Sequence, residues 1–301
     1  MKQIVDELML AGVRKVWTNE PLANHTTWRI GGPADLLIQP EDKRSLQKAL
    51  QILHRHAIPW SVIGRGSNLL VRDRGIRGAV LKVAEGLSHC EFRGEEVCVG
   101  AGYSMIRLAV EAGKLGLTGL EFAGGIPGTV GGAVYMNAGA HGSDLSRILI
   151  DAEVLFEDGE TKVLTNEEMG FSYRTSLLQK RKGIVVEVRL QLRKGDRKEI
   201  AATLAAYKER RRRTQPLQLP CAGSVFRNPP GDHAGRLIEA AGLKGYQIGG
   251  AQVSEIHANF IVNRGGATAN DVLTLMNHIQ RTILEKFGVE LHPEVLVVGE
   301  G

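Results

Sequence analysis

Two glycine-rich segments decide how this chain folds: Ile63-Gly64-Arg65-Gly66-Ser67-Asn68-Leu69-Leu70, and Gly124-Gly125-Ile126-Pro127-Gly128-Thr129-Val130-Gly131-Gly132-Ala133, which is followed by Asn137-Ala138-Gly139. Glycine accepts positive φ angles and lets main-chain N–H groups approach a ligand without an intervening side chain. Successive N–H donors in such turns converge on an anion, typically a phosphate. Two segments of this kind in one chain predict a cofactor that carries a diphosphate.

Other glycine motifs fit the sequence less well. The P-loop pattern, which needs Gly-Lys-Ser/Thr after a four-residue spacer, is absent. Gly100-Ala101-Gly102 begins like a dinucleotide fingerprint, but Met105 stands at its third glycine position, and Leu69 stands there in the first segment. A series of tight turns in a barrel or sandwich is the structural alternative for residues 124–139. Six glycines in that stretch, against a background of about 7%, favour the phosphate interpretation.

Composition narrows the class of protein. The chain has 301 residues, 43% of them hydrophobic and 24% charged, with a net charge of +5. This balance suits small anionic ligands, whereas a nucleic-acid-binding protein needs a denser basic surface with exposed aromatic side chains. Asp6 and Glu7 interrupt the hydrophobic stretch that a secretory signal would need, so the N-terminus is interpreted as a short amphipathic helix. With no run of roughly 18 apolar residues, we expect a cytoplasmic protein that neither enters a membrane nor binds nucleic acid.

The cysteines and histidines show no metal-ligand spacing, so the sequence predicts no metal site. His54 and His56 are two residues apart on a predicted helix and point in different directions. Cys90 and Cys98 flank Gly94 in a predicted hairpin and are expected to lie opposite each other. A reducing compartment keeps such thiols free.

Hydrophobic periodicity predicts an α+β protein in which helices and strands alternate. We expect an N-terminal helix and further helices at residues 41–53, 105–115, 198–213, 234–241 and 269–287. Strands are expected at residues 59–64, 78–83, 96–100, 150–156, 184–192, 258–263 and 294–298. Lys194-Gly195-Asp196 is a break between periodic segments and predicts a domain border near residue 195.

Six segments, in the expected order, resemble the UDP-N-acetylenolpyruvoylglucosamine reductase family, flavoenzymes of peptidoglycan precursor synthesis. They are Thr27-Trp28-Arg29-Ile30-Gly31-Gly32-Pro33-Ala34, the stretches 64–70 and 124–133, Tyr173-Arg174-Thr175-Ser176, Ala222-Gly223-Ser224-Val225-Phe226-Arg227-Asn228-Pro229 and His292-Pro293-Glu294-Val295. Only six residues, 177–182, separate the Tyr-Arg motif from the next strand. The chain therefore resembles the shorter subtype, which lacks the inserted loop that places a tyrosine over the substrate.

The resemblance implies a fold and a division of labour. Residues 1–195 would form an FAD-binding domain of the vanillyl-alcohol-oxidase type, made of two α+β subdomains with a boundary near residue 85. Residues 196–301 would form a smaller α+β substrate-binding domain, from which the C-terminal strand returns to the active site. The sequence does not reveal the oligomeric state, for which a monomer is favoured.

The same resemblance implies an activity. NADPH would reduce FAD and leave, and the reduced FAD would then reduce the enolpyruvyl group of a UDP-sugar to give UDP-N-acetylmuramate. The alternative enzyme is another FAD-dependent hydroxy-acid dehydrogenase of the same cofactor fold. Such an enzyme should lack the motifs around Ser224 and Glu294.

Three residues are expected to carry the chemistry. Hydride attack on the alkene leaves negative charge on the neighbouring carbon and its carboxylate, and the planar guanidinium of Arg174 suits that charge. By resemblance Ser224 delivers the proton to the carbanion, and Glu294 polarises or protonates the enolate. Without the motifs, these residues would be interpreted as a surface ion pair, a turn serine and an edge-strand glutamate.

The remaining site residues are assigned to the two ligands. The predicted cofactor contacts are Ile63, Gly64, Arg65, Gly66, Ser67, Asn68, Leu69, Gly124, Gly125, Ile126, Pro127, Gly128, Thr129, Gly131, Gly132, Ala133, Asn137 and Gly139. The predicted substrate contacts are Tyr173, Arg212, Arg227, Asn228 and His257. The basic run at residues 208–213 either pairs with the UDP diphosphate or simply favours the C-terminus of its helix.

Overall fold

The computed structural model describes all residues, 1–301, and divides into two compact units. Unit 1 consists of residues 1–18, 36–65 and 78–210, and unit 2 of residues 19–35, 66–77 and 211–301. Each unit has its own cluster of buried apolar side chains. The chain therefore crosses between the units several times, and the first glycine segment is divided between them after Arg65. The domain borders expected near residues 85 and 195 stay a prediction.

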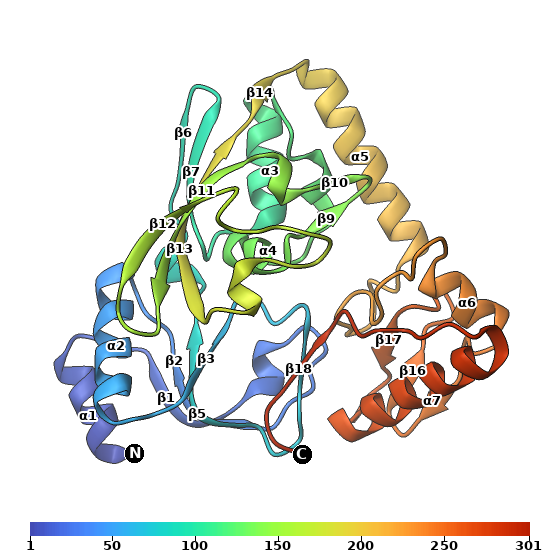
Figure 1. Ribbon diagram of the computed structural model, residues 1–301, viewed down its shortest axis with the longest axis horizontal. Helices are drawn as coiled ribbons and strands as arrows, with labels where there is room; N and C mark the ends of the chain where they lie inside the picture. The colour runs from blue at the N-terminus through green and yellow to red at the C-terminus, as the bar shows by residue number, and fades with distance from the viewer. The chain divides into compact units, whose positions relative to one another are not determined.

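The first half of the chain supplies a four-stranded sheet in the order β1-β2-β5-β3 (Figure 1). Its strands are β1 (Val16–Pro21), β2 (Pro33–Ile38), β5 (Ile76–Lys82) and β3 (Trp60–Ile63), and β3 runs parallel to β5. Helix α2 (Lys43–Arg55) begins with a capping box between Asp42 and Ser45, and helix α1 (Lys2–Leu10) packs beside it. Leu46, Leu50 and Leu53 of α2 are buried with apolar residues of β2 and β5.

Unit 1 also holds a five-stranded antiparallel sheet in the order β12-β11-β13-β7-β6. The strands are β12 (Thr161–Thr165), β11 (Leu149–Phe156), β13 (Gly183–Gln191), β7 (Glu96–Gly100) and β6 (Cys90–Arg93). Helix α4 (Val130–Met136) packs against β13 and β7, and α3 (Met105–Lys114) lies on the same side of the sheet (Figure 1). The face that the helices cover is apolar, whereas the opposite face carries charged side chains, as alternation along each strand requires.

Helix α5 and several short strands and 3-10 helices are the other elements of the first 214 residues. Helix α5 (Arg197–Thr214) packs Ile200 and Leu204 against α3 at Gly113, where an added Cβ would come within 3.1 Å of either side chain. The two-residue strands are β8 (Leu117–Thr118), β9 (Gly139–Ala140), β10 (Ser143–Asp144) and β14 (Arg193–Lys194), and the 3-10 helices are η1 (Leu22–His25), η2 (Glu85–Leu87), η3 (Glu121–Gly125), η4 (Leu145–Arg147) and η5 (Leu177–Gln179).

Unit 2 packs two helices on a small sheet. Strands β15 (Gln247–Ile248), β16 (Ala251–Val253) and β17 (Ile261–Asn263) are antiparallel, and α6 (Ala234–Ala240) and α7 (Ala269–Phe287) accompany them. The fully buried Trp28 joins this core, and its Nε1 donates a hydrogen bond of 2.9 Å to the Ile261 carbonyl. A parallel pair, β4 (Leu69–Val71) with β18 (Leu296–Val298), brings the C-terminal strand beside the first glycine segment.

The expected mixture of helices and strands is confirmed, and each expected long helix begins and ends within a few residues of its predicted bounds. The second glycine segment leads into helix α4, so the structural alternative of a series of tight turns does not describe it. One expectation, for the two cysteines of the hairpin, is wrong. Cys90 and Cys98 pair with Val99 and Glu91, so they lie on opposite faces of the hairpin. All three cysteines are free thiols, as expected. None of the helices combines the length and apolar composition that crossing a membrane requires.

Asp73 caps a helix to which it is not connected in sequence, and this contact is testable. Its two carboxylate oxygens accept hydrogen bonds from the N–H groups of Ala269 (2.8 Å) and Asn270 (3.0 Å), in the first turn of α7. We expect Asp73→Ala to lower the free energy of unfolding by about 1–2 kcal/mol, the usual cost of a lost cap. Urea unfolding followed by circular dichroism measures the change. Arg74→Ala, which removes an exposed neighbouring side chain, should change stability much less.

Candidate active site

The first glycine segment presents a row of main-chain donors. The N–H groups of Gly64, Arg65, Gly66, Ser67 and Asn68 have no hydrogen-bond partner within the protein. Two of the carbonyl oxygens are used, since that of Gly66 accepts from the Thr27 N–H (3.2 Å) and that of Asn68 accepts from the Leu296 N–H (3.0 Å). The loop is therefore held through its acceptors, and its donors remain available to an anionic ligand.

Two glycines in this loop are required by crowding. A Cβ added to Gly64 would lie 2.5 Å from Thr129 Oγ1, and one added to Gly66 would lie 2.3 Å from the His25 carbonyl oxygen. Gly66 also has a φ of 62°, in the left-handed region that favours glycine. The first of these contacts places Gly64 of the first glycine segment against Thr129 of the second, inside unit 1.

The second glycine segment serves packing more than donation. The N–H groups of Gly128, Val130 and Gly131 donate to carbonyl oxygens of Ile126, Tyr103 and Ala101. Those of Gly132 and Ala133 are occupied within α4 and its N-cap. The expectation that this segment offers free amides is therefore wrong for these residues. They stay predicted cofactor contacts, through atoms other than these amides.

Asn137 and Gly139 also have structural roles. Asn137 ends α4 in the left-handed conformation, its Oδ1 accepts from the Ser146 N–H, and its Nδ2 donates to the Ser172 carbonyl. The Gly139 carbonyl accepts a hydrogen bond of 2.8 Å from Nη2 of Arg174. The predicted catalytic arginine is thus anchored beside the end of the second glycine segment, within unit 1.

Arg174 stands in an unusual backbone conformation. Its φ of 55° lies in the left-handed region, where a non-glycine residue is strained. Ser172 and Thr175 close the turn around it with reciprocal main-chain hydrogen bonds of 3.1 Å. Gln179 Nε2 donates to the Arg174 carbonyl (2.9 Å). Tyr173 is exposed, and the guanidinium carbon of Arg174 lies 5.1 Å from the centre of its ring.

Unit 2 brings the other two predicted catalytic residues onto paired segments. The Val225 carbonyl accepts from the N–H of Glu294 at 2.7 Å, and the N–H of Arg227 donates to the His292 carbonyl at 2.9 Å. Ser224 precedes this pairing directly, so Ser224 and Glu294 lie on adjacent stretches of backbone. Asn68 of the first glycine segment joins them, since its Nδ2 donates to the Glu294 carbonyl (3.1 Å).

A buried amide holds the serine segment in place. Asn259 is 3% exposed. Its Oδ1 accepts from the Phe226 N–H (2.9 Å) and its Nδ2 donates to the Phe226 carbonyl (2.8 Å). The Val225 N–H donates to the main-chain carbonyl of Asn259. The backbone that follows Ser224 is thus held by Asn259 as well as by residues 292–294. The sequence did not reveal this role of Asn259.

The predicted substrate residues differ in their surroundings. Arg227 has a buried Nε without an acceptor. Arg211, also in unit 2, has one too, although it was not among the predicted contacts. Arg212, which was predicted, is exposed. Asn228 Oδ1 accepts from the Ala234 N–H at the start of α6. Burial lowers the pKa of His257, with a further contribution from the charge of Lys244.

The structure therefore brings Ser224, Glu294 and Asn68 together in unit 2, and Gly64, Thr129, Gly139 and Arg174 together in unit 1.

Unit 1 also has an open groove of about 630 Å³, which none of the predicted site residues lines. Its aromatic rings are covered by the protein's own cations, Arg181 over Phe156 and Lys182 over Trp60. The unpaired amides of residues 64–68, rather than this groove, are what a diphosphate cofactor requires.

The fold and the loop define an FAD-binding protein, and comparison with known proteins supports this class. Residues 34–165 match the family described as "FAD binding domain", and residues 215–298 match "UDP-N-acetylenolpyruvoylglucosamine reductase, C-terminal domain". The UDP-N-acetylenolpyruvoylglucosamine reductase of Bacillus licheniformis is 58% identical over 301 residues, which cover 100% of this chain and 99% of that protein. This chain belongs to the UDP-N-acetylenolpyruvoylglucosamine reductase family.

Solved structures agree with the family and with the predicted fold class. The reductase of this name from Thermus caldophilus is 40% identical with a TM-score of 0.81, covering 94% of this chain and 98% of that one. An alkyldihydroxyacetonephosphate synthase, 16% identical with a TM-score of 0.51, covers 64% of this chain and 40% of its own, and shows the fold alone. The expected α+β fold with an FAD-binding domain of the vanillyl-alcohol-oxidase type is confirmed.

Removal of the Asn259 side chain tests its support of the serine segment. Asn259→Ala leaves both main-chain groups of Phe226 buried without partners, which should cost about 1–3 kcal/mol of unfolding free energy. We also expect a lower kcat, because the backbone that carries Ser224 loses its anchor. Asn270→Ala is the control, since that exposed asparagine touches neither segment. An unchanged stability and kcat in Asn259→Ala would contradict this assignment.

Proposed function

We propose that this chain reduces the enolpyruvyl group of UDP-N-acetylenolpyruvoylglucosamine to UDP-N-acetylmuramate, with FAD as cofactor and NADPH as electron donor, in peptidoglycan precursor synthesis. Full-length similarity to reductases of this name supports the reaction. The observation that carries the residue assignment is the pairing of the Ser224 and Glu294 segments beside the loop of unpaired amides.

The unpaired amides of residues 64–68 fit the diphosphate of FAD, since they offer consecutive donors, two of them at glycines where a side chain would clash. FAD, when bound, would supply the hydride that is added to the alkene. The protein then has to hold the negative charge that develops on the adjacent carbon and its carboxylate, and has to deliver a proton to that carbon.

Arg174 is the group proposed to hold the charge. Its guanidinium is permanently positive, and its planar fork matches a carboxylate. One nitrogen is already fixed on the Gly139 carbonyl, so the fork enters the reaction with a defined orientation. Such preorganised charge stabilises a transition state because no reorganisation is needed as the charge forms.

Ser224 is the proposed proton donor to the carbanion. A hydroxyl is a weak acid, and it suffices only because the accepting carbon is strongly basic. Glu294, in its protonated form, donates to the enolate oxygens, because an ionised carboxylate would repel the developing anion. The main-chain pairing of Val225 with Glu294 keeps the two donors on adjacent segments.

The UDP diphosphate is the proposed partner of the buried arginines of unit 2. Arg211 and Arg227 each keep a buried Nε–H without an acceptor, and an anionic ligand would satisfy such groups. Tyr173, Arg212, Asn228 and His257 remain proposed substrate contacts. The connection after Arg174 is short, so no inserted loop stands over the substrate. Within this connection Gln179 supports the arginine turn.

Absorbance of the flavin tests the function. Purified protein should be yellow, NADPH should bleach it, and enolpyruvyl-UDP-N-acetylglucosamine should restore the colour. Protein that is colourless and does not take up FAD would refute the proposal, and so would bleached protein that the substrate fails to reoxidise.

The two half-reactions separate the role of Ser224 from that of the fold. We expect Ser224→Ala to keep the rate of flavin reduction by NADPH and to slow reoxidation by the substrate by about 10²–10⁴-fold, the range for a lost general acid. Stopped-flow absorbance measures both rates. Ser88→Ala, which removes an exposed hydroxyl, should leave both unchanged. Equal losses in the two half-reactions of Ser224→Ala would show that this serine is not the proton donor.

A further inference from the structure

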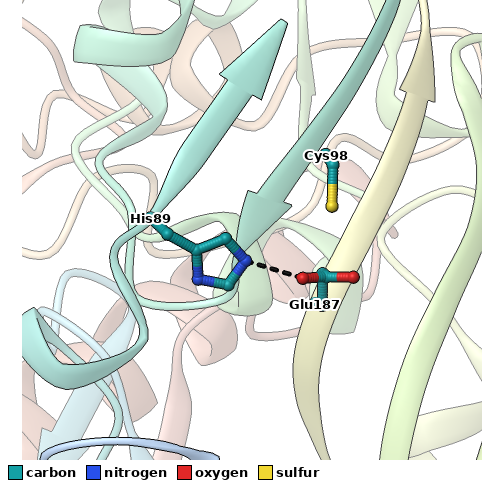
Figure 2. Close-up of side chains that lie close together, drawn as sticks. All are labelled: His89, Cys98 and Glu187. Carbon is teal, nitrogen blue, oxygen red and sulfur yellow. Dashed lines mark hydrogen bonds and ion pairs between the residues drawn. The ribbon is translucent and has the colours of Figure 1, made fainter. Parts of the chain in front are cut away.

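Three side chains with metal-binding atoms meet on the charged face of the five-stranded sheet, away from α4. They are His89, just before β6, Cys98 of β7 and Glu187 of β13 (Figure 2). One nitrogen, one sulfur and one oxygen from the three residues all lie within 4.8 Å of one another. His89 is exposed and the other two are partly buried, so the group is open to solvent on one side.

Strand register explains why these residues meet. Cys98 is opposite Arg189, and Glu187 is opposite Gly100, so Cys98 and Glu187 are diagonal neighbours on one face. Gly100 leaves room for the imidazole, because a Cβ there would lie 2.9 Å from Nδ1 of His89. The His89 ring therefore lies over Gly100, and its Nε2 reaches Oε2 of Glu187 at 2.7 Å.

From this grouping we propose that His89, Cys98 and Glu187 form a zinc site, with water as the fourth ligand on the exposed side. Imidazole nitrogen, thiolate sulfur and carboxylate oxygen are the three ligand types that Zn²⁺ takes in proteins. Bonds of about 2.0–2.3 Å place neighbouring ligand atoms roughly 3.3–3.8 Å apart around a tetrahedral ion. Two of the donor atoms are 2.7 Å apart and all three lie within 4.8 Å of one another, so side-chain rotation on a fixed sheet can bring them to this spacing.

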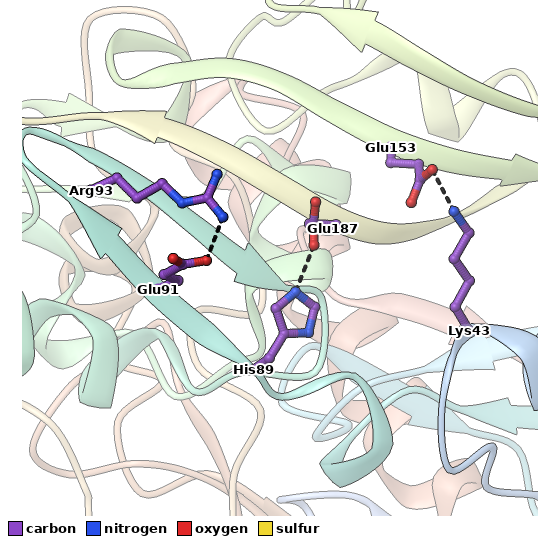
Figure 3. Close-up of polar contacts among 6 residues, drawn as sticks. All are labelled: Lys43, His89, Glu91, Arg93, Glu153 and Glu187. Carbon is purple, nitrogen blue, oxygen red and sulfur yellow. Dashed lines mark hydrogen bonds and ion pairs between the residues drawn. The ribbon is translucent and has the colours of Figure 1, made fainter.

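Charge favours a divalent cation here. Around the site Arg93 pairs with Glu91 and Lys43 pairs with Glu153 (Figure 3). Arg189, which is opposite Cys98, pairs with Asp151. The neighbouring cations are thus engaged with other carboxylates. One thiolate and one carboxylate balance the two charges of the ion, and neutral His89 adds a nitrogen without adding charge.

Zinc binding must release a proton. The thiolate is the form of cysteine that binds zinc, whereas an ordinary cysteine side chain is mostly a neutral thiol near pH 7. When the Zn–S bond forms, the thiol proton goes to the buffer. The imidazole changes tautomer, so that Nε2 binds the ion and Nδ1 carries the ring proton. The bound ion would fasten the start of β6 to β13.

Calorimetry of the FAD-containing protein, stripped with a chelator and titrated with zinc chloride, tests the site. We expect one Zn²⁺ per chain and about one proton released per ion, read from titrations in two buffers of different ionisation enthalpy. Cys98→Ser and Glu187→Gln should each weaken binding at least about tenfold, since loss of even an outer partner of a metal ligand costs that much. X-ray absorption at the zinc edge should show one sulfur neighbour.

Cys90→Ser is the matched control, because Cys90 belongs to the same hairpin but faces the opposite side of the sheet. It should bind zinc like the unaltered protein, with the same proton release. Flavin content and circular dichroism verify that each variant is folded. Zinc binding that Cys98→Ser leaves unchanged, that Cys90→Ser weakens equally, or that shows no sulfur neighbour would overturn the proposal.

Discussion

The active-site arrangement in unit 2 depends on main-chain hydrogen bonds between segments that are far apart in sequence. Glu294 donates to the Val225 carbonyl, and Leu296 donates to the Asn68 carbonyl. Each bond contributes only about 1 kcal/mol net, but the cost of closing the long loops rises slowly with their length. The bonds therefore hold Asn68, the serine segment and the backbone of Glu294 in one frame. The backbone that carries the two proposed catalytic residues of unit 2 is positioned by these bonds.

The sequence predicts the long elements of the fold and misses the short ones for a physical reason. Helices α2 and α7 have apolar periodicity and capping boxes, so their bounds are visible locally. Strand β4 has three residues and was not expected, since it exists because it pairs with β18, which lies within the strand expected at residues 294–298. Helix α4 contains Gly131, although glycine disfavours helices by about 1 kcal/mol. Packing overrides that propensity, since a Cβ at Gly131 would lie 2.9 Å from the Cβ of Ala101.

In the candidate site, too, the sequence reveals some residues and not others. Motif residues such as Ser224 and Glu294 are found by resemblance, whereas the residues that support them look ordinary in the sequence. Asn259 is one polar residue among many until its amide is seen to bind both main-chain groups of Phe226. Along α5 only Ile200 is buried, so no periodicity indicates that Arg211, rather than Arg212, has the buried Nε. Cys98 and Glu187 are joined only by strand register, which their spacing in the sequence does not reveal.

Arg174, the arginine proposed to hold the developing charge, combines local backbone strain with a fixed orientation. A left-handed conformation costs a non-glycine residue on the order of 1–3 kcal/mol and persists only where the surroundings over-determine it. Here the turn between Ser172 and Thr175, the Gln179 amide and the Gly139 carbonyl all fix the arginine. A freely rotating arginine would lose rotamer entropy at the moment when charge develops on the substrate. The short connection after Arg174 restricts this side chain when the protein folds. The rotamer entropy is therefore lost during folding, and the guanidinium is oriented before the proposed reaction begins.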